Sequence, residues 1–281
     1  MSWIEEFLTL VFPLNRADLN IEAGFDLKQK NIPKRLYKYR SFDEDGRSLK
    51  NLEEDTVWIA DPLIFNDPYD CHHFIDYESL LDVFAKDLPD DLKKLLTPTV
   101  LDSLKKRSTS VISEFQKAGD KIKDGIRLCS FSERVDSTLM WAHYSYNHQG
   151  FCIEYDVTRP EAHELTSRFM FPVIYSDDVF DATELIKFVE NGNFNNLYLN
   201  LAALHKASDW SYEREWRLVF ANSTMETPRP WGMPKPTTVF CGSHISKANE
   251  AKIKEVCLQK KIPLLKMEHD RHMYRMVPKE L

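Results

Sequence analysis

The stretch that decides the fold is Gly125–Val157, GIRLCSFSERVDSTLMWAHYSYNHQGFCIEYDV. Its first eight residues, GIRLCSFS, have the composition of a β-strand, and its last part, GFCIEYDV, alternates apolar and polar residues as a half-buried strand does. Between them, Ser137 and Thr138 are N-cap residues for a helix rich in Met, Trp, His and Tyr, and Gly150 is a residue type that ends helices. The stretch therefore predicts strand, helix and strand, and we interpret it as one wall of a small-molecule site.

The rest of the chain alternates short strands with helices, without the regular repeat of a doubly wound sheet. We predict an α+β (mixed α/β) fold with a short-stranded central β core. Residues 1–30 are expected to form an N-terminal helix and a connector, and residues 31–281 a single domain with helical insertions at about 78–123 and 180–209.

Composition narrows the classes of function. The formal net charge of −7 over 281 residues argues against bulk binding of nucleic acid. No apolar run approaches the ~20 residues of a membrane span, and the N-terminus does not resemble a signal peptide. Five cysteines without a CxxC pair are expected to be free and buried. We expect a cytoplasmic protein with no membrane partner.

Two polar clusters lie on predicted strands. In YKYRS, Arg40 follows Tyr39 at a strand end, where an arginine can bind a phosphate or carboxylate with two hydrogen bonds; a surface salt bridge is the alternative. Ser130 and Ser132 lie two residues apart, so their hydroxyl groups face one way and can meet a ribose or a carboxylate. No G-x-S-x-G motif surrounds either serine, which argues against a serine hydrolase.

The helix after this strand has two faces. Trp141, Tyr144 and His148 share one face by their spacing, and Met140 and His143 share another. We expect one face to be core and the other to line the site, with Trp141 buried.

Two acidic clusters follow. Glu213 and Glu215 are two residues apart at a predicted strand start, so both carboxylates are expected to point one way, with Arg217 in the same row; a structural ion-pair ladder is the alternative. FNDPYDCHH, which contains Asp70, is dense in turn residues and has no complete metal-ligand set at usual spacing. We predict no metal site.

Four motifs, YKYRS, FNDPYDC, CSFSE…MWAHYSYNHQGFCIEYD and WSYEREWRLVF, resemble those of a widespread, uncharacterised bacterial domain-of-unknown-function family. More loosely, the order Arg40, Ser130-Phe131-Ser132 and Glu213-Arg214-Glu215 is similar to that of Arg-Ser-Glu type ADP-ribosyltransferases. That resemblance implies that NAD is the substrate and that Arg40 holds its phosphates. It also implies that Ser130 orders the site, that an aromatic side chain stacks on the nicotinamide, and that Glu215 stabilises the charge that develops as nicotinamide leaves. The gaps between the motifs are longer than in compact members of that group.

Three hypotheses follow for function. The first is an NAD-dependent ADP-ribosyltransferase or NAD glycohydrolase with an unknown acceptor. Its catalytic residues would be Glu215 and Glu213, and its NAD-binding residues would be Arg40, Tyr39, Ser130, Ser132, Trp141, His143 and Tyr144. The second is a non-catalytic nucleotide- or ligand-sensing module of a bacterial defence or stress system. The third is a metal-dependent nuclease that uses Asp70 with the two glutamates. The first two hypotheses predict that Arg40, Ser130, Trp141 and Glu215 line one pocket.

Overall fold

The structure is a computed structural model, which describes residues 2–76, 123–158, 164–184, 193–221 and 225–281. The expected helical insertion at 78–123 lies, except for its last residue, outside the described residues. The chain divides into two compact units. Unit 1 comprises Met1–Lys30, Pro62–Ile126 and Ser176–Ala207, and unit 2 comprises Asn31–Asp61, Arg127–Tyr175 and Ser208–Leu281. The predicted α+β class is confirmed.

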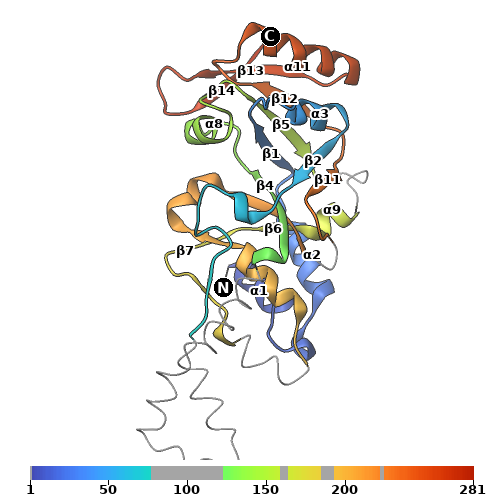
Figure 1. The fold of residues 1–281 in the computed structure, drawn as a ribbon, viewed down its shortest axis with the longest axis vertical. Helices are drawn as coiled ribbons and strands as arrows, with labels where there is room; N and C mark the ends of the chain where they lie inside the picture. The colour runs from blue at the N-terminus through green and yellow to red at the C-terminus, as the bar shows by residue number, and fades with distance from the viewer. Residues whose placement is uncertain (1, 77–122, 159–163, 185–192, 222–224) are drawn as a thin grey trace, which may run out of the picture. The chain divides into compact units, whose positions relative to one another are not determined.

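Unit 2 is built on an eight-stranded sheet in the order β14–β13–β12–β5–β1–β4–β10–β6 (Figure 1). Its central strand, β1, pairs antiparallel with β5 on one side and with β4 on the other, so segments about a hundred residues apart in sequence meet at β1. The strands are β1 (Arg35–Arg40), β4 (Ile126–Ser132), β5 (Phe151–Asp156), β6 (Met170–Pro172), β10 (Glu215–Ala221), β12 (Thr238–Cys241), β13 (Leu264–His269) and β14 (Met276–Glu280).

Helices and a two-stranded ribbon complete unit 2. The predicted strand–helix–strand stretch is β4, α8 (Thr138–Tyr144) and β5, and the Ser137 hydroxyl accepts a hydrogen bond from the Met140 amide at 3.4 Å as the predicted N-cap. α8 contacts β1, and α3 contacts both β2 and α11. The remaining elements are α3 (Arg47–Glu53), β2 (Thr56–Ile59), α9 (Glu164–Phe169), β7 (Ile174–Ser176), η4 (Ser208–Glu213), β11 (Arg229–Gly232) and α11 (Lys247–Lys260).

Unit 1 begins with a helix that the sequence predicts. α1 (Trp3–Val11) starts with a capping box between Ser2 and Glu5, and its buried side is formed by Phe7 and Val11. The predicted connector within residues 1–30 is instead largely helical, because Asn20 accepts a hydrogen bond from the Ala23 amide and so caps α2 (Ile21–Asn31). A short 3-10 helix, η1 (Arg16–Asp18), lies between the two.

Within the helical insertion predicted at about 180–209, the structure describes residues 180–184 and 193–209. They include β8 (Phe180–Asp181), two helical residues at 183–184, the 3-10 helix η3 (Asn196–Ala203), β9 (His205–Ala207) and the first residues of η4. The Asn195 amide group donates hydrogen bonds to the carbonyl oxygens of Val11 and Pro13, so tertiary contacts hold the start of η3. β8 pairs parallel with β3 (His73–Phe74), and η2 (Pro62–Ile64) lies upstream of β3.

The alternation of β1 separates its side chains onto two faces of the sheet. Tyr37 and Tyr39 belong to a buried cluster with Trp141 and Phe240. The Tyr39 and Trp141 rings meet edge to face with centroids 5.1 Å apart. Lys38 and Arg40 therefore occupy the opposite face of β1, away from α8.

The buried Glu154 carboxylate links β5 by hydrogen bonds to its neighbouring strand β1 and to the start of β12. Glu154 is 3% exposed and accepts hydrogen bonds from the Tyr37 hydroxyl of β1 at 3.0 Å and from the Thr237 hydroxyl at 2.6 Å. Thr238 of β12 donates a further hydrogen bond to the same carboxylate at 3.3 Å. Several donors thus compensate for the burial of its charge.

All five cysteines are free and buried, as the sequence predicts. Within the part of the chain that the structure describes, no helix has both the length and the apolar character needed to cross a membrane.

Candidate functional site

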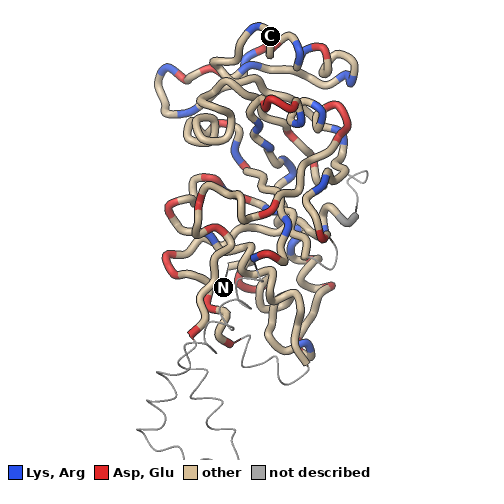
Figure 2. The backbone as a smooth tube through the Cα atoms, in the orientation of Figure 1, with Lys and Arg blue, Asp and Glu red and all other residues tan. Residues whose placement is uncertain are grey.

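A row of cations on β1 forms the centre of the candidate site. β1 carries Arg35, Lys38 and Arg40, and blue recurs along this strand in Figure 2. Lys38 and Arg40 are two residues apart on an extended strand, so they share a face. Both are only partly exposed. We call these two residues the Lys38–Arg40 row.

The Lys38 amine has neutral partners. It donates a hydrogen bond to the Ser130 carbonyl oxygen at 2.7 Å and lies 5.7 Å from the centroid of the Phe131 ring. Burial is the main cause that lowers the pKa of Lys38, and the charge of Arg40 acts in the same direction, whereas Cys129 and Glu215 oppose it. An anion beside this amine would stabilise its charged form.

Arg40 has no partner in the described part of the chain. Its Nε and Nη2 atoms are buried and make no hydrogen bond, and no carboxylate there forms an ion pair with it. Each buried N–H donor left unpaired costs about 1–3 kcal/mol, and more for a charged group. A guanidinium with two buried, unpaired nitrogen atoms is therefore the feature of this site that a ligand would satisfy best.

Tyr155 adds a second unpaired donor on the same face of the sheet. Its Cα atom pairs with that of Leu36, which shares a face with Lys38 and Arg40. The side chain is fully buried and its hydroxyl has no hydrogen-bond partner. Burial raises the pKa of Tyr155, while the charge of Arg40 lowers it, so the hydroxyl remains a donor at neutral pH.

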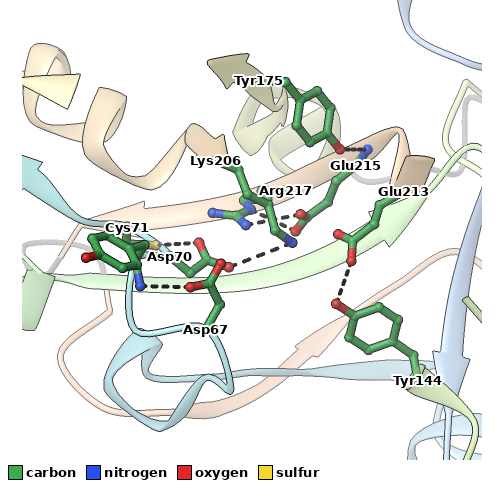
Figure 3. A network of polar contacts seen from close by, with 10 residues as sticks. Asp67, Asp70, Cys71, Tyr144, Tyr175, Lys206, Glu213, Glu215 and Arg217 are labelled. Atoms are coloured by element: carbon green, nitrogen blue, oxygen red, sulfur yellow. Dashed lines mark hydrogen bonds and ion pairs between the residues drawn. The ribbon is translucent and has the colours of Figure 1, made fainter. Parts of the chain in front are cut away.

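The two predicted catalytic glutamates have partners of their own (Figure 3). The Glu215 carboxylate accepts hydrogen bonds from Arg217 Nε at 2.8 Å and Nη2 at 3.1 Å, and both side chains are buried. The Glu213 carboxylate accepts a hydrogen bond from the Tyr144 hydroxyl at 2.5 Å and is 2% exposed. Neither carboxylate faces solvent.

The expectation that Glu213 and Glu215 share one strand face is wrong. Glu213 ends η4 and only Glu215 belongs to β10. Arg214 between them has a φ of 44°, a left-handed conformation that interrupts strand alternation. Burial and the nearby Glu213 carboxylate both raise the pKa of the Tyr144 hydroxyl, which stays protonated as the donor.

The sheet also separates residues that the sequence analysis placed in one pocket. Trp141 is fully buried, as predicted, and its indole N–H donates to the Val135 carbonyl oxygen at 2.7 Å. It packs on Tyr39, whereas Arg40 occupies the other face of β1. Arg40 and Trp141 therefore cannot line a common pocket.

The two serines lie on the Trp141 side. Ser132 pairs with Tyr37 across β1 and β4, so Ser132 and Ser130 share the face of Tyr37. The Ser132 hydroxyl donates to the Glu213 carbonyl oxygen at 2.5 Å and accepts from the Arg134 amide at 3.0 Å. Those hydrogen bonds give Ser132 a structural role between β4 and η4.

The remaining predicted residues are spread further. His143 is exposed, with its ring 6.4 Å from that of Trp210.

In unit 1, Asp70 forms an ion pair with Lys206 at 3.9 Å and accepts a hydrogen bond from Cys71 (Figure 3). The predicted turn at this point is confirmed, because Asp67 accepts a hydrogen bond from the Tyr69 amide at 2.9 Å. Among the described residues, no three His, Cys, Asp or Glu side chains form a set that could hold a metal ion.

Sequence reasoning missed Lys38 and Tyr155 as members of the site. Strand alternation through YKYR places Lys38 beside Arg40, so a signal for Lys38 was present. Tyr155 reaches this face only through the pairing of β5 with β1, which no local pattern specifies.

The chain matches no curated protein and no solved structure. Residues 140–218, from α8 into β10, match the family described as protein of unknown function (DUF2971). The predicted resemblance to a family of unknown function is thereby confirmed over these residues.

Proposed function

We propose that the Lys38–Arg40 row binds the phosphate groups of a nucleotide-type small molecule, with NAD as the first candidate. The observation that carries the proposal is the Arg40 guanidinium, whose buried Nε and Nη2 have no partner in the described residues. A guanidinium presents its N–H groups in a fork that matches the oxygens of a phosphate. A bound phosphate would thus satisfy donors that the protein leaves unpaired.

The donor set supports an anion over a neutral ligand. Arg40 and the Tyr155 hydroxyl offer unpaired donors, and Lys38 contributes a positive charge that no carboxylate in the described chain pairs with. Phosphate oxygens are acceptors only, so they complement such a set. A nucleoside without phosphate carries no negative charge, so it can accept only single neutral hydrogen bonds from Arg40.

Binding without turnover is the function that the geometry supports best. A carboxylate that stabilises an oxocarbenium ion must face the reacting atom, and the Glu215 carboxylate faces Arg217 instead. This favours a ligand-sensing module over an enzyme. The localisation that we propose for such a module is the cytoplasm.

Cleavage of NAD is a second candidate, for one reason. The charge of Glu215 acts on the Lys38 amine, so a carboxylate lies within the electrostatic field of the proposed phosphate site. In this alternative, Arg217 would have to release Glu215 when NAD binds.

Calorimetric titration tests the proposal. We expect NAD and ADP-ribose to bind, and adenosine and nicotinamide, which lack phosphate, to bind at least tenfold more weakly. Arg40→Met should abolish binding of the two phosphate-bearing ligands. Lys34→Met is the control, because Lys34 is an exposed cation directly before the same strand.

The outcomes separate the candidates. If wild-type protein binds neither NAD nor ADP-ribose, or if Arg40→Met binds them as wild type does, the phosphate site is refuted. Nicotinamide release from NAD by wild type, lost in Glu215→Gln, would show that the second candidate is correct.

A further inference from the structure

Three histidines from separate segments of unit 2 form a cluster. The ring centroids of His148 and His269 are 5.2 Å apart, those of His148 and His244 are 5.6 Å apart, and those of His244 and His269 are 5.9 Å apart. His148 is partly buried and the other two are exposed. We call this set the three-histidine cluster. Histidine side chains can take up and release protons near neutral pH.

The loop that carries His148 is in an unusual conformation. Three consecutive residues, Tyr146, Asn147 and His148, have φ values of 50°, 52° and 65°, in the left-handed region that non-glycine residues seldom adopt. Backbone hydrogen bonds hold this loop to the segment after β12, from the His244 amide to the His148 carbonyl at 3.0 Å and from the Gly242 amide to the Gly150 carbonyl at 2.9 Å. A strained segment of this kind persists only while its surroundings hold it.

The described acids nearest to the cluster in the sequence each have a cation of their own. On β13, Glu268 forms an ion pair with Lys279, and Asp270, just after the strand, forms one with Arg275. The segment after β12 contributes His244 and then Lys247 and Glu250 of α11, and Glu250 forms an ion pair with Lys266 of β13 at 2.7 Å. The α8–β5 loop contributes no ionisable side chain besides those of Tyr146 and His148. His148 Nδ1 is buried without a hydrogen-bond partner. Burial, His269 and His244 all lower the pKa of His148, so a proton on His148 is unfavourable in the folded state.

The same loop touches the proposed phosphate site. A Cβ atom on Gly150 would lie 2.0 Å from the Arg40 carbonyl oxygen, so the backbones are in close contact there. The next residue, Phe151, is the Cα partner of Arg40 in the β1–β5 ladder. A shift of residues 145–150 therefore changes the backbone position next to Arg40.

We propose that protonation of the three-histidine cluster releases the loop 145–150 and thereby weakens ligand binding at the Lys38–Arg40 row. This inference rests on the proposed phosphate-binding function. Because the pKa of His148 is lowered in the folded state, the unfolded or released state takes up more protons as the pH falls below about 6.5. The closed loop is thus favoured above pH 7 and is lost progressively on acidification.

The test is the pH dependence of NAD binding, measured by calorimetry at pH 7.5 and pH 5.5. The pyrophosphate of NAD does not titrate in this range, so a change in affinity reports on the protein. We expect binding to be about tenfold weaker at pH 5.5, within the usual range of coupling between two sites. The double variant His244→Gln/His269→Gln should lose less affinity at pH 5.5 than wild type does, because the two histidines no longer lower the pKa of His148 and only its burial remains.

His272→Gln is the control. His272 is exposed and lies three residues beyond His269, so this variant should retain the wild-type pH dependence. The inference is refuted if wild-type affinity is the same at both pH values, or if the double variant is as sensitive to pH as wild type.

A second measurement separates failure of the inference from failure of the proposed function. The amide resonances of Gly150 and Gly242 are followed by NMR over the same pH range, without ligand. We expect both to shift with the midpoint of the His148 ring signals, and to shift with a different midpoint in the double variant. If NAD does not bind at any pH, the proposed function fails, and the loop movement is decided by these resonances alone: shifts that are absent, or that are unchanged in the double variant, refute it.

Discussion

Replacement of Arg40 by methionine should make the ligand-free protein more stable, although Arg40 is partly buried and sits on the central strand of the sheet. Its Nε and Nη2 donors are buried without partners, and its charge opposes that of Lys38. Unpaired buried donors cost about 1–3 kcal/mol each, and methionine retains most of the side-chain volume. After allowance for imperfect packing, we expect the free energy of unfolding to rise by about 1–3 kcal/mol.

Urea unfolding followed by tryptophan fluorescence measures this change. With a slope of about 3 kcal/mol per molar urea, the midpoint should rise by about 0.3–1 M. Arg217→Met provides the contrast, because Arg217 is fully buried and bonds to Glu215 twice. Its loss leaves a buried carboxylate without its cation and should cost about 3–5 kcal/mol. If Arg40→Met lowers the midpoint as Arg217→Met does, then Arg40 has a structural role and the argument for a ligand is refuted.

Three further changes have defined outcomes. Trp141→Ala should lower the free energy of unfolding by about 3–5 kcal/mol in urea, because the side chain is fully buried against Tyr39; an unchanged midpoint would contradict that packing. Gly150→Ala should lower the melting temperature, because its Cβ atom would overlap the Arg40 carbonyl oxygen, whereas Gly232→Ala, with nothing within 4 Å, should not. Ser137→Ala should cost about 1 kcal/mol through loss of the α8 cap, and a cost near zero in the same urea assay would show that the 3.4 Å hydrogen bond contributes nothing.

Local sequence patterns predicted those elements whose ends are set by residues close to them in the sequence. α8 is an example, because Ser137 accepts a hydrogen bond from the Met140 amide and caps the helix where the sequence predicts its start. The start of β14 at Met276 is also set locally, since Asp270 accepts hydrogen bonds from the His272 and Met273 amides and holds a turn before the strand.

The candidate site was less predictable, for reasons of geometry. Alternation along YKYR is a sequence property, yet which face meets α8 depends on pairing with β4 and β5. Arg214, which lies between the two glutamates, has a left-handed conformation, so Glu213 and Glu215 do not share a strand face as their spacing predicts. The absence of a partner for Arg40 and the meeting of three histidines both depend on contacts between distant segments, which spacing in the sequence does not encode.

The buried carboxylate of Glu154 has a consequence for how the sheet assembles. A slip of two residues between β5 and a neighbouring strand would keep every side chain on its proper face, so hydrophobic patterning alone does not reject it. Such a slip would move Glu154 away from Tyr37 on one side and from Thr237 and Thr238 on the other. A buried charge without its donors costs several kcal/mol. Glu154 therefore selects the native register of β5 against both of its neighbouring strands.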